Sequence, residues 1–118
     1  MGTKRRHRST SPEYRPDEYH DVTGAAPAMA GSALTSHIWN AYKQVAYLTP
    51  DGHVHELCCN AAGQWTHADL NDVVLPPPFA PADPAANGSA LTSYSWGASK
   101  QVVYFTPDGH VHEFCYTP

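Results

Sequence analysis

The chain has 118 residues, with seven Lys and Arg against eleven Asp and Glu, which gives a formal net charge of −4. A chain of this length can build one ordinary hydrophobic core, and its acidic balance argues against the basic face of a nucleic-acid-binding protein. Apolar and aromatic residues make up 42% of the sequence, too many for a wholly disordered chain. Eleven prolines and eight glycines interrupt it too often for long helices or membrane spans.

The first part of the chain differs from the rest in charge. Five of the seven basic residues lie within the first fifteen positions. Residues 1–17 show no apolar period, so we expect a disordered basic tail, with a small phosphate-binding or nucleic-acid-binding arm as the alternative. No apolar run follows the basic start, as a secretory signal would require. The sequence therefore predicts a cytoplasmic or non-classically exported protein without a membrane partner.

An internal repeat dominates the sequence from residue 31 onward. Residues 31–61 and 88–118 match at 21 of 31 positions with an offset of 57 and no gap. The segment Thr49–Glu56 recurs unchanged as Thr106–Glu113. Identity at a fixed period is typical of a repeat architecture.

Each repeat unit has the pattern of short β-strands. In the first unit we expect strands over residues 33–39, 43–49 and 53–59, and a fourth from residue 64 to about 71. The residues Pro50-Asp51-Gly52 predict a tight turn between two of these strands, because proline presets the first turn position and glycine accepts a positive φ. Neither unit shows a helical period.

Four antiparallel strands in roughly 40–50 residues is the size of one β-propeller blade. We therefore predict an all-β fold of propeller blades, with blade 1 at about 31–71, a Pro/Ala linker at 72–87 and blade 2 at about 88–118. The second unit ends after its third strand, and we expect residues 18–24 to complete it. Two blades cannot close a ring. Either several chains assemble, with a trimer favoured, or the chain is a fragment of a longer array.

Three segments of the second unit carry a recognisable pattern: Ser95-Trp96-Gly97, Val103-Tyr104 and Asp108 through Tyr116. With their counterparts in the first unit, they resemble the blade pattern of the fucose-specific lectins, a family of fungal and bacterial six-bladed propellers. The resemblance implies a non-catalytic protein that binds glycans at several blade junctions through an arginine, a glutamate and a tryptophan. Some bacterial members are two-blade chains that trimerise, which implies a homo-oligomer here.

The resemblance also assigns residues. The family glutamate is matched by Glu56 and Glu113, whereas the arginine position holds Val45 and Val102. Without arginine a bidentate donor is missing, so the resemblance implies weaker and less fucose-selective sites. Donors nearby in sequence are Lys43, Gln44, Lys100 and Gln101. The predicted carbohydrate-binding residues are Glu56, Glu113, Trp39, Trp96, Trp65 and Tyr116. We expect Tyr47 and Tyr104 to pack in the core instead.

Two other classes of function remain open: a propeller scaffold for protein interaction with a decayed sugar site, and a metal-dependent or hydrolytic enzyme. The pair His53 and His55 lies on one strand face, as does the pair His110 and His112, which suits a shared metal. No third ligand follows at a fixed spacing, so we expect no metal and no cofactor. The candidate glutamates and histidine pairs occur in both units, which fits multivalent binding better than one asymmetric active site. We therefore expect no enzymatic activity.

Overall fold

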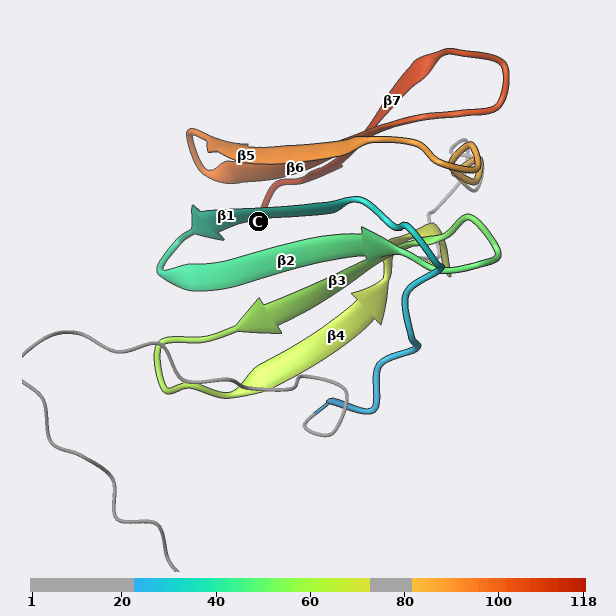
Figure 1. The fold of residues 1–118 in the computed structure, drawn as a ribbon. Coiled ribbons are helices and arrows are strands. Elements are labelled where there is room, and N and C mark those ends of the chain that lie inside the picture. The colour runs from blue at the N-terminus through green and yellow to red at the C-terminus, as the bar shows by residue number, and fades with distance from the viewer. Residues whose placement is uncertain (1–22, 73–81) are drawn as a thin grey trace, which may run out of the picture.

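The computed structural model describes residues 23–72 and 82–118, which form two antiparallel sheets (Figure 1). The first sheet contains β1 (Leu34–Trp39), β2 (Tyr42–Leu48), β3 (Val54–Cys59) and β4 (Trp65–Asp69) in chain order. The second sheet contains β5 (Leu91–Trp96), β6 (Ser99–Phe105) and β7 (Val111–Tyr116), also in chain order. A short 3-10 turn, η1 (Leu70–Asp72), follows β4. Among the described residues no helix is long and apolar enough to cross a membrane.

The strands agree with the sequence-based expectation to within one or two residues at each end. The fourth strand of the first unit is β4, and the expected strand end near residue 71 is the turn η1. Residues 1–22 and 73–81 lie outside the described residues. The basic tail, much of the linker and the strand expected at residues 18–24 therefore stay predictions. Thr23 and Gly24, the described end of that segment, belong to no strand.

The turn between β2 and β3 is closed by its own side chains. Thr49 Oγ1 donates to Asp51 Oδ1 at 2.5 Å, and this bond holds the pKa of Asp51 below its usual value. Gly52 has a φ of +82°, and a Cβ atom at this position would lie 3.0 Å from the carbonyl oxygen of Ala85. The backbone amide of Ala85 donates to the Gly52 carbonyl at 2.8 Å. The turn of the first sheet thus binds the linker that leads into the second sheet.

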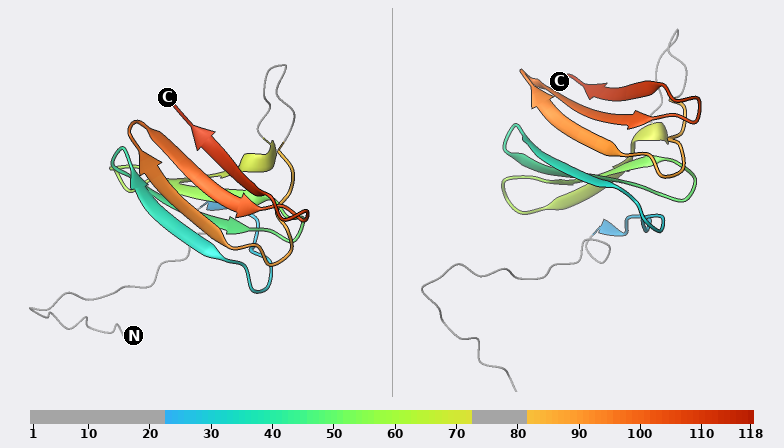
Figure 2. Two further views of the ribbon diagram at one scale, coloured as in Figure 1. Left: turned by 90° about the horizontal axis from the view of Figure 1, so that it is seen from above. Right: turned by 45° about the horizontal axis from the view of Figure 1, so that its top comes forward.

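The two sheets lie one over the other, with β1 beside β5 (Figure 2). The hydroxyls of Thr35 on β1 and Ser93 on β5 are 2.8 Å apart and share a hydrogen bond. The apolar core lies between the sheets and includes residues of both and of the linker. Its buried members are Ala46, Leu48, Val54, Ala85, Val102 and Tyr104.

The 57-residue repeat extends to hydrogen bonds outside the strands. The Tyr47 hydroxyl donates to the carbonyl of Ala26, and the Tyr104 hydroxyl donates to the equivalent carbonyl of Asp83. Both tyrosines are buried, which confirms the expectation that they pack in the core. Each unit therefore uses its tyrosine to fasten the extended segment that precedes it. Burial raises the pKa of both phenols.

Candidate functional site

Lys100 is the centre of a polar cluster at the junction of the two sheets. Its side chain leaves β6 toward the first sheet, where Nζ donates to Glu56 Oε1 at 2.8 Å and to Gln44 Oε1 at 3.1 Å. Gln44 on β2 and Glu56 on β3 are both buried. Strand alternation places them on the face of the first sheet that meets the second. Three strands of two units thus converge on one ammonium group.

Two aromatic rings enclose the same ammonium group. Lys100 Nζ lies 4.9 Å from the ring centre of Trp39 and 5.5 Å from that of Tyr116. The two rings meet edge to face, with centres 5.6 Å apart. The indole N–H of Trp39 donates to the carbonyl of Ala98 at 2.9 Å. A cation near the face of a ring is attracted by the ring quadrupole, so the aromatic pair and Lys100 stabilise one another.

A cleft of about 170 Å³ lies beside this cluster. It is lined by Trp39, Asn40, Ser95, Gly97, Ala98 and Pro118. Asn40 and Ala41 form the turn between β1 and β2 with φ angles of 51° and 64°, as a tight hairpin requires. The cleft is smaller than the roughly 300–1,000 Å³ of most small-molecule sites. Of the residues of the Lys100 cluster, Trp39 is the one that also lines this cleft.

The structure brings three of the six predicted binding residues together, namely Trp39, Glu56 and Tyr116. Glu56 is only 6% exposed and uses Oε1 to accept the bond from Lys100. Trp65 lies on the other face of the first sheet, where Lys43 Nζ is 5.4 Å from its ring centre. It takes no part in the Lys100 cluster.

The remaining two predicted residues, Trp96 and Glu113, lie on the face of the second sheet that points away from the first. Trp96 is 77% exposed, whereas its repeat counterpart Trp39 is 9% exposed. Glu113 Oε2 accepts from the Tyr94 hydroxyl at 3.0 Å, a bond that raises the pKa of Tyr94. Nearby, Gln101 Oε1 is buried without a hydrogen-bond partner. This face has the counterparts of the junction residues, but within residues 23–72 and 82–118 no sheet packs against it.

His37 on β1 faces the Lys100 cluster. Both of its ring nitrogens are buried and have no hydrogen-bond partner in the structure. Burial lowers the pKa of His37; the nearby Glu56 opposes this effect and Lys100 adds to it. The surroundings of His37 thus favour its neutral form.

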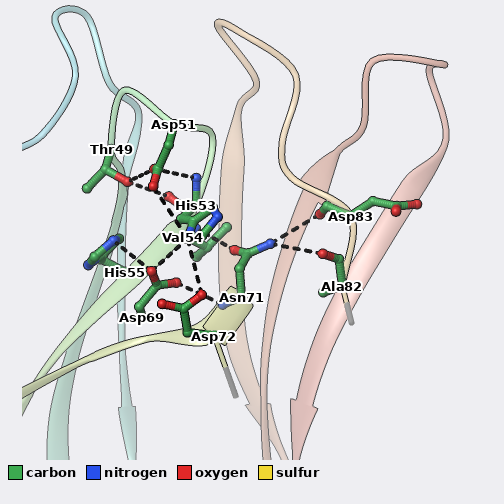
Figure 3. Close-up of polar contacts among 10 residues, drawn as sticks. All are labelled: Thr49, Asp51, His53, Val54, His55, Asp69, Asn71, Asp72, Ala82 and Asp83. Carbon is green, nitrogen blue, oxygen red and sulfur yellow. Dashed lines mark hydrogen bonds and ion pairs between the residues drawn. The ribbon is translucent and has the colours of Figure 1, made fainter. Parts of the chain in front are cut away.

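A second polar cluster lies at the end of the first sheet, around His53 (Figure 3). His53 Nδ1 is 2.6 Å from Asp69 Oδ2, 3.6 Å from Asp51 Oδ2 and 3.9 Å from Asp72 Oδ1. The hydrogen bond with Asp69 is the main cause of a raised His53 pKa. His55 Nε2 lies 3.5 Å from the same Asp69 oxygen. Within the described residues these side chains offer the donor types that hold a metal ion.

No protein-family model matches this chain, and no curated protein matches it. Among solved structures it is similar to AofleA, a fungal lectin from Arthrobotrys oligospora, solved as a variant with three arginines replaced by alanine. The two chains are 25% identical with a TM-score of 0.54, and the match covers 72% of this chain. The fold is that of β-propeller blades. This chain spans 23% of the length of that fungal chain.

Sequence reasoning named Lys100 as a nearby donor but did not place it in the site. The available signal was strand alternation: Lys100, Val102 and Tyr104 occupy alternate positions of β6 and all face the first sheet. In the second unit, the family resemblance assigns the arginine to the position of Val102. This residue follows Lys100 by two positions on β6 and lies on the same face of the strand. Asp69 and Asp72 were missed as neighbours of His53, because only the pairing of β3 with β4 brings them together.

Proposed function

We propose that this chain is a non-catalytic carbohydrate-binding module, with a binding site at the junction of its two blades. The observation that carries the proposal is the convergence of Trp39, Lys100 and Glu56 beside a shallow cleft. A sugar ring presents C–H groups that pack on an aromatic face and hydroxyls that need donors and acceptors. The similarity to a fungal lectin supports the same assignment.

In this proposal Lys100 takes the part that the resemblance gives to arginine. An ammonium group donates from one point, whereas a guanidinium donates through a planar fork. Each site therefore binds a monosaccharide weakly, and affinity depends on repeated sites on one assembly. Glu56 already accepts from Lys100, so a sugar hydroxyl has to share this carboxylate with the ammonium group.

The repeat indicates how a second site forms. Trp96, Gln101 and Glu113 occupy the positions in the second blade that Trp39, Gln44 and Glu56 occupy in the first. Lys43 is the counterpart of Lys100 and lies on the opposite face of the first blade, beside Trp65. A second copy that packs its first blade on the exposed Trp96 face brings Lys43 to Glu113. It also offers a donor to the unpaired Gln101 Oε1. Three copies joined in this way give a ring of six blades.

Binding is tested on a glycan array with the full chain, followed by titration of the strongest monosaccharide. Glu56→Gln removes the acceptor at the junction within the chain, and Glu113→Gln removes its counterpart on the exposed face. We expect each single variant to weaken array binding and the double variant to abolish it. Intact binding in the double variant contradicts the site.

Assembly is tested separately by light scattering at micromolar concentration. We expect an oligomer, which Lys43→Glu dissociates because it places two carboxylates together. Adding Glu113→Lys to this variant restores the opposite charges and with them the oligomer. A monomeric parent chain, or an oligomer indifferent to Lys43→Glu, contradicts the proposed contact.

One observation favours a second candidate function, an interaction scaffold without a working sugar site. The Glu56 carboxylate is buried and paired with Lys100, so the junction already satisfies its own charges. In that case the Lys100 cluster only joins the blades. This second function is supported if no glycan binds at millimolar concentration on the array while light scattering still shows the oligomer.

A further inference from the structure

Three carboxylates surround one imidazole at the end of the first sheet. Asp51 belongs to the turn before β3, Asp69 ends β4, and Asp72 belongs to η1. All three approach His53 Nδ1, at 3.6, 2.6 and 3.9 Å respectively. Figure 3 shows that the three aspartates come from separate segments and gather around the histidine side chain. The strand pairing holds them there, because His55 on β3 is the register partner of Asp69.

The cluster carries more negative charge than its protein partners neutralise. In residues 23–72 and 82–118, the ion pairs of these aspartates are formed by His53 and His55 and not by lysine or arginine. A proton on His53 neutralises one of three carboxylates. Like charges within a few ångströms repel, more strongly where the site is partly shielded from water. A divalent cation would compensate this charge better than a proton does.

His55 supplies an independent observation. Its side chain is 10% exposed, and its Nδ1 atom is buried without a hydrogen-bond partner. Its other nitrogen, Nε2, lies 3.5 Å from Asp69 Oδ2. A buried imidazole with an unsatisfied nitrogen costs free energy, so the ring is held at this position by the surrounding structure. Here the ring lies next to the carboxylate cluster.

We propose that this cluster binds one Zn²⁺ ion, with His53 and Asp69 as its central ligands. Imidazole nitrogen and carboxylate oxygen together are donors typical of zinc. Zinc–ligand bonds of about 2.0–2.1 Å in a tetrahedron separate neighbouring ligand atoms by roughly 3.3 Å. The ligand atoms of His53, Asp69 and Asp72 all lie within 4.8 Å of one another, and His53 Nδ1 is 3.9 Å from Asp72 Oδ1. The 2.6 Å contact between His53 and Asp69 has to widen, by rotation of two partly exposed side chains.

The sequence predicted no metal because no third ligand follows the histidine pair. Two further ligands beside His53 come from β4 and η1, which are distant in sequence from the histidine pair but close to His53 in the folded chain. Asp69 and Asp72 contribute them, and Asp51 and His55 complete a second set of donor atoms around the same His53. The site is a structural one, which ties the β2–β3 turn to the end of β4.

The second unit provides a matched internal control. It has the same turn residues, Asp108, His110 and His112, and their ligand atoms also lie close together. Its described residues include no fourth strand, so this cluster has one carboxylate where the first unit has three. The His110 side chain is 73% exposed, whereas that of His53 is 26% exposed. We therefore expect zinc at His53 and not at His110.

The experiment titrates zinc chloride into chelator-treated full-length chain by isothermal calorimetry. We expect one ion per chain, with affinity lowered more than about 100-fold in His53→Ala and in Asp69→Asn. His110→Ala keeps the parent affinity. Far-ultraviolet circular dichroism of each variant confirms that it is folded, and His53→Gln is a milder replacement if His53→Ala is not. Calcium chloride serves as the oxygen-preferring comparison ion and should bind at least 100-fold more weakly than zinc.

Three results overturn the proposal: no zinc binding below millimolar concentration, equal loss of affinity in His53→Ala and His110→Ala, or calcium bound as tightly as zinc. None of these outcomes bears on sugar binding at the blade junction, since Glu56 lies on the other face of the first sheet from His55 and Lys100 lies on β6 of the second sheet.

Discussion

Lys100 on β6 and Glu56 on β3 form an ion pair of 2.8 Å across the junction of the two blades. Their side chains are 15% and 7% exposed, so both charges are largely removed from water. Removal of either partner leaves the other charge buried without compensation, which is costly. The chain is therefore stable only when the two blades pack so that Lys100 and Glu56 meet.

Replacement of Lys100 tests this contribution. We expect Lys100→Met to lower the free energy of unfolding by about 3 kcal/mol, because the Glu56 carboxylate loses its partner. The double variant Lys100→Met, Glu56→Gln should recover a large part of this loss. Urea unfolding followed by tryptophan fluorescence measures both. A double variant that loses as much stability as Lys100→Met alone would contradict the argument.

The Tyr104 hydroxyl, which holds the extended segment before the second sheet, provides a second test. Tyr104→Phe removes the donor to the Asp83 carbonyl and should cost about 1 kcal/mol of stability. Tyr94→Phe removes an exposed bond to Glu113 and should cost clearly less. Thermal unfolding by calorimetry distinguishes the two variants. Equal losses would show that the Tyr104 hydroxyl does not fasten the linker.

The duplicated turns permit a matched glycine experiment. Gly52 and Gly109 have φ angles of +82° and +83°, so alanine is strained at both by about 1 kcal/mol. At Gly52 an added Cβ also lies 3.0 Å from the Ala85 carbonyl oxygen, whereas at Gly109 nothing lies within 4 Å. We expect Gly52→Ala to destabilise the chain more than Gly109→Ala in urea unfolding. The reverse order would show that the linker does not approach this turn closely.

His37 predicts a dependence of stability on pH. Burial lowers its pKa in the folded chain below the usual 6.5, with Glu56 and Lys100 as the charged groups that face it. The unfolded chain therefore takes up a proton first as the pH falls below about 6.5. The contribution of His37 is favourable above this pH and is lost progressively below it. Between pH 7.5 and pH 5.5, the parent chain should lose more stability than His37→Gln.

The control for the pH experiment is His67→Gln, because His67 is exposed on β4. This variant should retain the full pH dependence of the parent chain, measured by urea unfolding at both pH values. A parent chain and a His37→Gln variant with the same loss of stability would contradict the role of His37.

Much of the fold follows from local patterns. Alternation in Val54–Cys59, the turn residues Pro50 to Gly52 and the unchanged repeat of Thr49–Glu56 predicted strands that the structure contains. Period-two alternation is a local property of an extended chain, so it can be recognised without knowledge of the partner strand. The core positions of Tyr47 and Tyr104 were predicted because buried aromatic side chains usually fill cores, and they are confirmed.

The sequence by itself thus determined two near-identical sheet units and the residue types of their sites. Only the tertiary structure decided which of these residues meet. Trp39 and Trp96 are equivalent in sequence, yet one is buried against the neighbouring blade and the other is exposed. Packing of the two blades brings Lys100 to Glu56, and the pairing of β3 with β4 brings Asp69 to His53. Both contacts join segments that are distant in the chain. The repeat determines which residue types each unit contains. Whether these residues are buried or paired depends on the unit that packs against them, and no pattern within one unit specifies that neighbour.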